Sequence, residues 1–200
     1  MVTFKQIDPL FVIDLSNPEN PQVLGYLKIP GVSDYLHPYD ENYVIGAGRD
    51  ATDEGQIKGL KLSLFDASDP QNPKEVGKYF IGGRGTSSDV FYDHKAFLFS
   101  KEKNLLVIPV TVYDEWSYKW DGAYAFSVDT EKGFTLRGTV THQSDEFYKK
   151  NGYQDWLATV KRSLYMQDYL YTISQRMIKA SNLNTENLET VASVEIPYKE

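Results

Sequence analysis

The sequence predicts an all-β fold, built as an array of about four antiparallel sheets with up to four strands each. Three observations lead to this prediction. A strand–turn–strand phrase occurs twice, the strand pattern recurs about every fifty residues, and aromatic residues make up 14% of the chain. The strand candidates are bounded by Gly, Pro, Asp and Asn, which are the residues typical of turns.

The repeated phrase covers residues 11–25 and returns over residues 63–77. Pairs in the same register are Asp14/Asp66, Ser16/Ser68, Asn17/Asp69, Pro18/Pro70, Asn20/Asn72, Pro21/Pro73 and Gly25/Gly77. The apolar, β-branched run from Phe11 to Leu15 favours a strand. The Asp and Ser side chains bond to nearby backbone N–H groups and the prolines donate none, so a turn follows. Each copy therefore predicts a β-hairpin.

The strand candidates fall into four groups, at approximately residues 1–31, 33–83, 88–141 and 160–197. The first group is incomplete, with three strands at most, and one of these is near Val2–Lys5. Four strands in about fifty residues is the period of a β-propeller blade, whose apolar face only a neighbouring blade can cover. We expect one propeller-type domain over residues 1–200, as an open array or a fragment of a ring. A β-sandwich with incidental self-similarity is the alternative.

Three segments between the expected strands, and one of the strands, receive specific predictions. Residues 143–158 are expected to hold a short amphipathic helix with the unfavourable Gly152 in its middle. Residues 48–59 are predicted to be a long polar loop, and His94 to Ser100 a strand. Residues 113–122 are predicted to be an exposed aromatic loop.

Composition and charge exclude several classes of function. The net charge is −7 and there is no basic block, which argues against a nucleic-acid partner. Cysteine is absent, so disulfides and thiolate chemistry are excluded. We expect no membrane insertion, because no apolar run reaches the roughly 18 residues of a membrane span. The N-terminal residues do not resemble a signal peptide, and a chain that starts almost inside a strand is expected to be a fragment of a longer protein.

Three strings of the chain resemble a known group of proteins. They are residues 7–16 (IDPLFVIDLS), 35–42 (YLHPYDEN) and 93–99 (DHKAFLF). They are similar to archaeal and bacterial secreted proteins with a C-terminal β-propeller distantly related to WD40 repeats, and residues 193–197 are similar to the C-terminal end of those proteins. The resemblance implies that only the last blades are present here. It also implies an extracytoplasmic or secreted setting, and it supplies no catalytic residues.

The aromatic segment 113–122 is the first candidate site. Trp116, Tyr118 and Trp120 alternate with polar residues there. Loops on a rigid scaffold commonly carry binding residues, and exposed Trp and Tyr are frequent anchors that also stack on sugar rings. The alternative is that these rings fold back over the edge of a blade.

Acidic residues form the second candidate site. Asp34, Asp40, Asp50 and Asp53 could supply oxygen ligands to Ca²⁺, although their spacing is not that of an EF-hand. The alternative is a set of solvated loop and edge residues, in which case no cofactor is bound.

The histidines are the third candidate. Asp93 next to His94 could act as a general base, but no nucleophile motif accompanies the pair, so we expect His94 to be a buried structural residue. His142 lies at the end of a strand and is the least informative.

The leading functional hypothesis is a non-catalytic module that binds a protein, peptide or glycan. The second is a hydrolase or lyase with an acidic, Ca²⁺-dependent site on the propeller axis, formed by Asp34, His37, Asp89 or His94. The third is a homo-oligomer that pairs through exposed blade edges at Val2 and at residues 191–196.

Overall fold

The computed structural model describes residues 9–197, and its strands form four antiparallel sheets. Sheet 1 consists of β1 (Leu10–Asp14) and β2 (Gln22–Leu27). Sheet 2 consists of β3 (Val32–Pro38), β4 (Tyr43–Ala51), β5 (Ile57–Asp66) and β6 (Lys74–Ile81). The all-β prediction with an incomplete first sheet is confirmed, while the strand expected near Val2–Lys5 lies outside the described residues.

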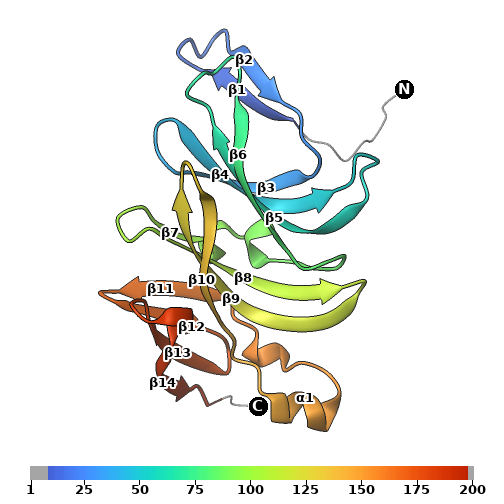
Figure 1. Ribbon diagram of the computed structural model, residues 1–200, viewed down its shortest axis with the longest axis vertical. Coiled ribbons are helices and arrows are strands. Elements are labelled where there is room, and N and C mark those ends of the chain that lie inside the picture. The colour runs from blue at the N-terminus through green and yellow to red at the C-terminus, as the bar shows by residue number, and fades with distance from the viewer. Residues whose placement is uncertain (1–8, 198–200) are drawn as a thin grey trace.

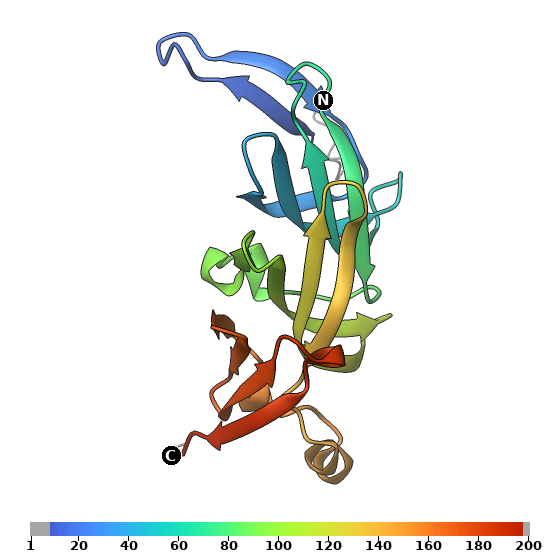
Figure 2. The same cartoon turned by 60° about the vertical axis from the view of Figure 1, so that its left-hand side comes forward.

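Sheets 3 and 4 complete the array. Sheet 3 consists of β7 (Leu98–Ser100), β8 (Leu105–Asp114), β9 (Ser117–Asp129) and β10 (Gly133–Val140). Sheet 4 consists of β11 (Arg162–Met166), β12 (Tyr169–Ile173), β13 (Met177–Asn182) and β14 (Thr190–Glu195). The strands of every sheet lie in chain order, so each pair of neighbours is antiparallel and consecutive. The sheets follow one another along the longest axis (Figure 1) and form a curved, open stack (Figure 2).

The repeated phrase folds into the same hairpin in both places. Asp14 pairs with Gln22 and Asp66 pairs with Lys74, and both hairpins have a register shift two positions further along the strands. The backbone N–H of Ser16 donates to the Asp14 carboxylate at 2.8 Å, and that of Ser68 donates to Asp66 at 2.9 Å. The local hydrogen bonds that the Asp and Ser residues predict are therefore present in both turns.

The apolar core lies between the sheets. One cluster joins sheets 2 and 3, with Leu62 and Leu64 of β5 packed near Ile108 of β8 and Phe126 of β9. A second cluster joins sheets 3 and 4, through residues such as Leu105 and Leu170. Because each sheet buries its apolar side chains on a neighbour, the stability of the array depends on contacts between sheets.

Glycine permits the closest approach between neighbouring sheets. Gly25, Gly77 and Gly138 occupy the same position of β2, β6 and β10, directly after the residue that bulges out of the ladder. A Cβ atom on Gly77 would lie 2.8 Å from the Cα of Gly133, the first residue of β10 after the β9–β10 turn. Any larger residue at this position would force the two sheets apart.

Two strand predictions need correction. The strand expected over His94 to Ser100 is reduced to β7, because His94–Ala96 forms a 3₁₀ turn that the Asp93 side chain caps at the Lys95 N–H. The polar loop expected over residues 48–59 is shorter, because β4 continues to Ala51 and β5 begins at Ile57.

The helical insert is present, but its limits differ from the prediction. Helix α1 (Asp145–Asn151) is followed by a 3₁₀ turn at Trp156–Ala158. Gly152 is not in the middle of the helix; it caps the C-terminal end with φ of 76°, a conformation that favours glycine. In the described part of the chain, no helix is long and apolar enough to cross a lipid bilayer.

Gly77→Ala is expected to destabilise the fold by about 1–3 kcal/mol, because the added methyl group meets backbone that cannot move freely. Urea unfolding measures this change. Val76→Ala, at the neighbouring exposed position, is the control and should change stability by less than about 0.5 kcal/mol. Equal stability of Gly77→Ala and the parent chain would contradict the close contact.

Candidate functional site

The predicted aromatic loop is in fact a regular hairpin. β8 extends to Asp114 and β9 begins at Ser117, so only Glu115 and Trp116 form the turn. Both have positive φ, at 45° and 68°, as a two-residue hairpin turn requires. The prediction that residues 113–122 form a loop was wrong, because the alternation of aromatic and polar residues was interpreted as a loop rather than as the two faces of a strand.

The three aromatic residues predicted to bind ligand do not lie together. Trp116 is exposed and lies against the preceding loop, where the Arg84 guanidinium is 5.5 Å from its ring centre. Tyr118 and Trp120 instead line a groove next to α1, and Trp116 is not among the residues that line it. Trp116 therefore does not share the groove that Tyr118 and Trp120 line.

The groove between the β8–β9 hairpin and α1 is a cavity of about 280 Å³. Its walls combine aromatic rings with hydroxyl, amide and charged groups, from Tyr118, Lys119, Trp120, Thr141, Gln143, Ser144, Asp145 and Tyr148. The Tyr118 and Tyr148 rings stack with their centres 6.0 Å apart. The Trp120 and Tyr124 rings pack edge to face with their centres 5.2 Å apart, which holds the indole in place. This arrangement offers flat apolar surfaces beside hydrogen-bonding groups.

Asp121 lies beneath this groove and is fully buried. Its Oδ2 atom accepts hydrogen bonds from Gln143 Nε2 at 2.8 Å, from the Tyr118 hydroxyl at 3.4 Å and from the Thr159 hydroxyl at 3.4 Å. Its Oδ1 atom has no partner among the described residues. Because Tyr118 and Gln143 also line the groove, the hydrogen bonds to Asp121 position two of the side chains that form its wall.

Burial raises the pKa of Asp121 to about 6, although the hydrogen bonds from Gln143, Tyr118 and Thr159 act in the opposite direction. Burial also raises the pKa of Tyr118, and the Asp121 charge adds to that effect. Asp121 was not among the site residues expected from the sequence. The sequence places this carboxylate between Trp120 and Gly122, at a position that faces inward once the segment is a strand. Because the segment was predicted to be a loop, Asp121 was not expected to be buried.

His142 is the buried histidine of the described chain, and the prediction for His94 was wrong. His94 is exposed. His142 is 2% exposed, with its two ring nitrogens 2.9 Å from the Ser174 hydroxyl and 2.8 Å from the Thr172 hydroxyl. It joins the end of sheet 3 to sheet 4, and burial together with the nearby Lys179 lowers its pKa to about 4. The sequence alone could not distinguish the two histidines, since only the packing of sheets places one of them inside.

The four predicted calcium ligands are not brought together. Asp34 pairs with Arg49 at 3.3 Å, Asp40 with Lys101 at 2.7 Å and Asp50 with Lys58 at 3.9 Å, while Asp53 is exposed. Over residues 9–197, no group of three or more Asp, Glu or His side chains is arranged to share a metal ion.

The residues considered for an axial acidic site are also dispersed. The Tyr35 hydroxyl lies 2.9 Å from His37 Nδ1, and the His37 ring packs against Phe97 with centres 4.9 Å apart. Asp89 pairs with Lys161 at 3.1 Å. His37 and Asp89 therefore contribute to contacts between neighbouring elements.

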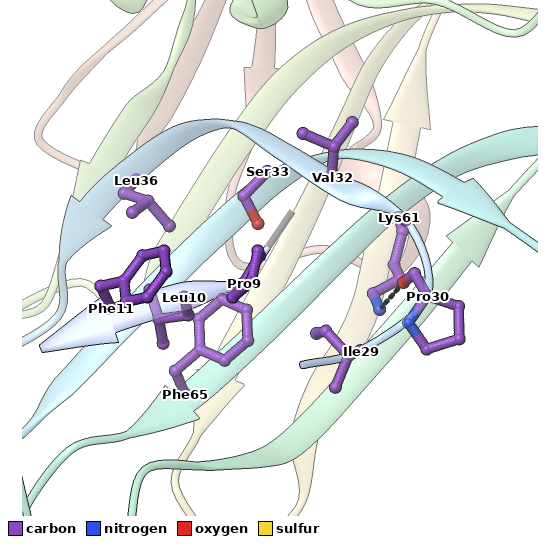
Figure 3. A pocket seen from close by; sticks show the side chains of 11 residues that line it. Pro9, Leu10, Phe11, Ile29, Pro30, Val32, Ser33, Leu36, Lys61 and Phe65 are labelled. Atoms are coloured by element: carbon purple, nitrogen blue, oxygen red, sulfur yellow. Dashed lines mark hydrogen bonds between the residues drawn. The ribbon is translucent and has the colours of Figure 1, made fainter. Parts of the chain in front are cut away.

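A second cavity lies between sheets 1 and 2, and its lining is mainly apolar. It measures about 130 Å³ and is lined by residues such as Leu10, Leu36 and Phe65 (Figure 3). The Lys61 ammonium at its edge donates to the Pro30 carbonyl at 3.2 Å and pairs with Glu75 at 2.9 Å. Because this charge is already paired, the cavity offers less chemistry than the groove beside α1.

Asp121→Asn is expected to remove a pH-dependent loss of stability. The folded pKa of about 6 lies above the ordinary value of 3.8, so the folded state binds the proton more tightly and Asp121 costs stability as pH rises from about 4 to about 6. The cost reaches up to about 3 kcal/mol. Denaturant unfolding should show Asp121→Asn gaining stability relative to the parent chain across this interval. If the stability of Asp121→Asn and of the parent chain changed with pH in the same way, burial would not raise the pKa of Asp121.

His142→Gln is expected to show the opposite slope. The folded pKa of about 4 lies below the ordinary value of 6.5, so the parent chain loses stability as pH falls through this interval. The loss reaches up to about 3 kcal/mol, and glutamine, which does not titrate, should be free of it. The stability difference between the variant and the parent chain, measured at each pH, isolates this effect from that of Asp121. If His142→Gln lost as much stability at low pH as the parent chain does, groups other than His142 would be responsible for that loss.

Two archaeal relatives match almost the whole chain. An uncharacterized protein of Methanocaldococcus jannaschii is 38% identical over 202 aligned residues, which cover 99% of this chain and 27% of the relative. An uncharacterized protein of Archaeoglobus fulgidus is 36% identical over 192 residues, which cover 92% of this chain and 24% of the relative. The chain thus spans about a quarter of the length of these relatives.

The family comparison agrees with the stacked four-stranded sheets and their shared hairpins. The match to the beta propeller domain extends over residues 1–186, which includes sheets 1 to 3 and most of the segment that forms sheet 4. This chain therefore belongs to the beta propeller domain family.

Proposed function

We propose that this chain is a non-catalytic binding module and that its ligand, a glycan, lies in the groove between the β8–β9 hairpin and α1. The observation that carries the proposal is the convergence of Tyr118, Trp120 and Tyr148 on one cavity of about 280 Å³. Aromatic rings can stack on the apolar face of a sugar, and sugar hydroxyls need donors and acceptors beside that face.

The polar part of the groove suits such a ligand. Thr141, Ser144 and Asp145 lie along it, so hydroxyl and carboxylate groups stand next to the rings. Lys119 is also present, so the wall carries both signs of charge. A mixed wall of this kind favours a neutral, hydroxyl-rich ligand over a strongly charged one.

The groove is also held in shape before any ligand arrives. Gln143 joins Asp121 to the backbone of Asp155, accepting from its N–H at 2.9 Å and donating to its carbonyl at 2.9 Å. A preorganised site avoids part of the entropy cost of binding. The rigid sheets of the propeller supply the scaffold, and the helical insert supplies the second wall.

We also infer that the protein acts outside the cytoplasm. This inference rests on the similarity of residues 7–16, 35–42 and 93–99 to secreted archaeal and bacterial propeller proteins. We do not propose the alternative of a hydrolase or lyase, because the acidic residues considered for it lie apart, with Asp34 paired with Arg49 and Asp89 paired with Lys161.

Tyr148→Ala is expected to weaken glycan binding at least tenfold, because it removes one ring of the groove while the exposed position on α1 tolerates the change. An array of neutral oligosaccharides identifies the tightest probe, and calorimetric titration then compares the variants. Tyr153→Ala is the matched control, since this tyrosine belongs to the same insert and is exposed but does not line the groove.

Trp116→Ala provides a second control, at an exposed residue that does not line the groove, and it should bind like the parent chain. Thermal unfolding verifies that all variants are folded. Full binding by Tyr148→Ala would exclude the groove. If the chain bound peptides in the groove but bound no oligosaccharide, the groove would be a peptide site and the glycan proposal would be excluded.

A further inference from the structure

Asp121 receives all of its side-chain hydrogen bonds on one carboxylate oxygen. Gln143 Nε2 and the hydroxyls of Tyr118 and Thr159 donate to Oδ2, at 2.8, 3.4 and 3.4 Å. The Oδ1 atom is buried and has no partner among the described residues. An ionised carboxylate only accepts, so it holds all three donors at once, and its charge strengthens each bond.

A proton on Asp121 would disturb this arrangement at either oxygen. On Oδ2 the proton occupies a position that a donor now uses, so one of the three contacts is lost. On Oδ1 it forms a buried O–H group without an acceptor, which is costly, and the bonds to Oδ2 lose the contribution of the charge. The protonated carboxyl group therefore holds Tyr118 and Gln143 less firmly than the carboxylate does.

The effect reaches the groove through Tyr118 and Gln143. The Tyr118 hydroxyl bonds to Asp121, while its ring stacks on Tyr148 with the centres 6.0 Å apart and forms part of the groove wall. Gln143 connects the same carboxylate to the backbone of Asp155, which follows α1 in the chain. When these contacts weaken, the hairpin and the insert both lose a restraint on their position beside the groove.

The surroundings of Asp121 bring its titration close to neutral pH. Burial raises its pKa to about 6, while its hydrogen bonds and the nearby Lys161 ammonium act in the opposite direction. Lys161 also pairs with Asp89 at 3.1 Å. The other ionisable side chains at the groove or on the elements that meet there are Tyr113, Lys119, Asp145, Tyr148, His142 with the nearby Lys179, and Asp155 paired with Arg176.

We propose that Asp121 is the proton-sensitive positioning residue of the groove: the ionised carboxylate holds Tyr118 and Gln143 in the binding arrangement, and its protonation releases them and weakens ligand binding. This role rests on the proposed binding of a glycan in the groove, and it adds that the groove binds its ligand at neutral pH and releases it in acid. By reciprocity, a bound ligand expels the proton from Asp121.

The affinity of the parent chain for a neutral oligosaccharide is expected to fall about tenfold between pH 7 and pH 5, because Asp121 is about nine tenths ionised at the first pH and about one tenth at the second. Calorimetric titration with the tightest oligosaccharide of the array measures the affinity at each pH. Asp121→Asn, which carries no charge, should bind at every pH with the low affinity that the parent chain has at pH 5. Thermal unfolding verifies that each variant is folded at both pH values.

Lys161→Gln tests the same role without changing a residue that lines the groove. Because the ammonium favours the ionised form of Asp121, its removal should move the fall in affinity to higher pH. His142→Gln is the matched control, since this side chain titrates where sheets 3 and 4 meet but does not line the groove, and it should keep the pH profile of the parent chain. Asp145→Asn removes the carboxylate in the groove wall and should retain the tenfold fall, whatever its affinity.

The results separate this role from the proposed function. An affinity for the oligosaccharide that is constant from pH 7 to pH 5 would overturn the role of Asp121 and leave the groove as a glycan site. A fall that persists in Asp121→Asn would overturn it as well, because another group would then carry the proton.

If no oligosaccharide bound at either pH, the proposed glycan function would fail, and the side-chain amide signals of Gln143 in NMR spectra would test the carboxylate directly. Signals that change with a midpoint near pH 6 in the parent chain and not in Asp121→Asn would support the proton-dependent contact. Signals that do not change with pH would refute it.

Discussion

The structure depends on one constraint: a four-stranded antiparallel sheet has two faces and cannot cover either of them alone. The sheets therefore stack, and the turn of each outer hairpin presses against the preceding sheet at Gly25, Gly77 or Gly138. These contacts bring backbone against backbone, which leaves no room for a side chain. The bulge before each glycine bends the outer strand at the same place, so that one geometry repeats along the array.

The interface between sheets 3 and 4 adds a polar component to this packing. His142 forms hydrogen bonds with Thr172 and Ser174 across the interface. Asp121 accepts hydrogen bonds from Gln143 and Thr159, which lie on either side of helix α1 in the chain. Helix α1 has no buried residue of its own. Its segment is held by capping and by hydrogen bonds such as the paired contacts of Arg176 with Asp155 at 3.0 and 2.9 Å. Polar contacts, rather than an apolar core, thus set the position of the insert.

The candidate site follows from that arrangement. A regular hairpin supplies Tyr118 and Trp120, and the insert supplies Tyr148, so the groove forms where a repeated element meets a non-repeated one. The repeated parts provide rigidity and leave little freedom for a binding site. In our proposal, the insert is the place where a ligand binds, because a change there does not disturb the stacking of the sheets.

The sequence alone determined the repeating hairpin, because Asp14, Ser16 and their counterparts act through hydrogen bonds within a few residues. For the same reason the four groups of strands were predictable. The groove, the buried Asp121 and the choice of His142 over His94 were decided by tertiary structure, because burial depends on which sheet faces which and no local pattern encodes this. The dispersal of Asp34, Asp40 and Asp50 onto three separate cations has the same cause. Residues of the same type become buried, paired or exposed only when the sheets pack against one another.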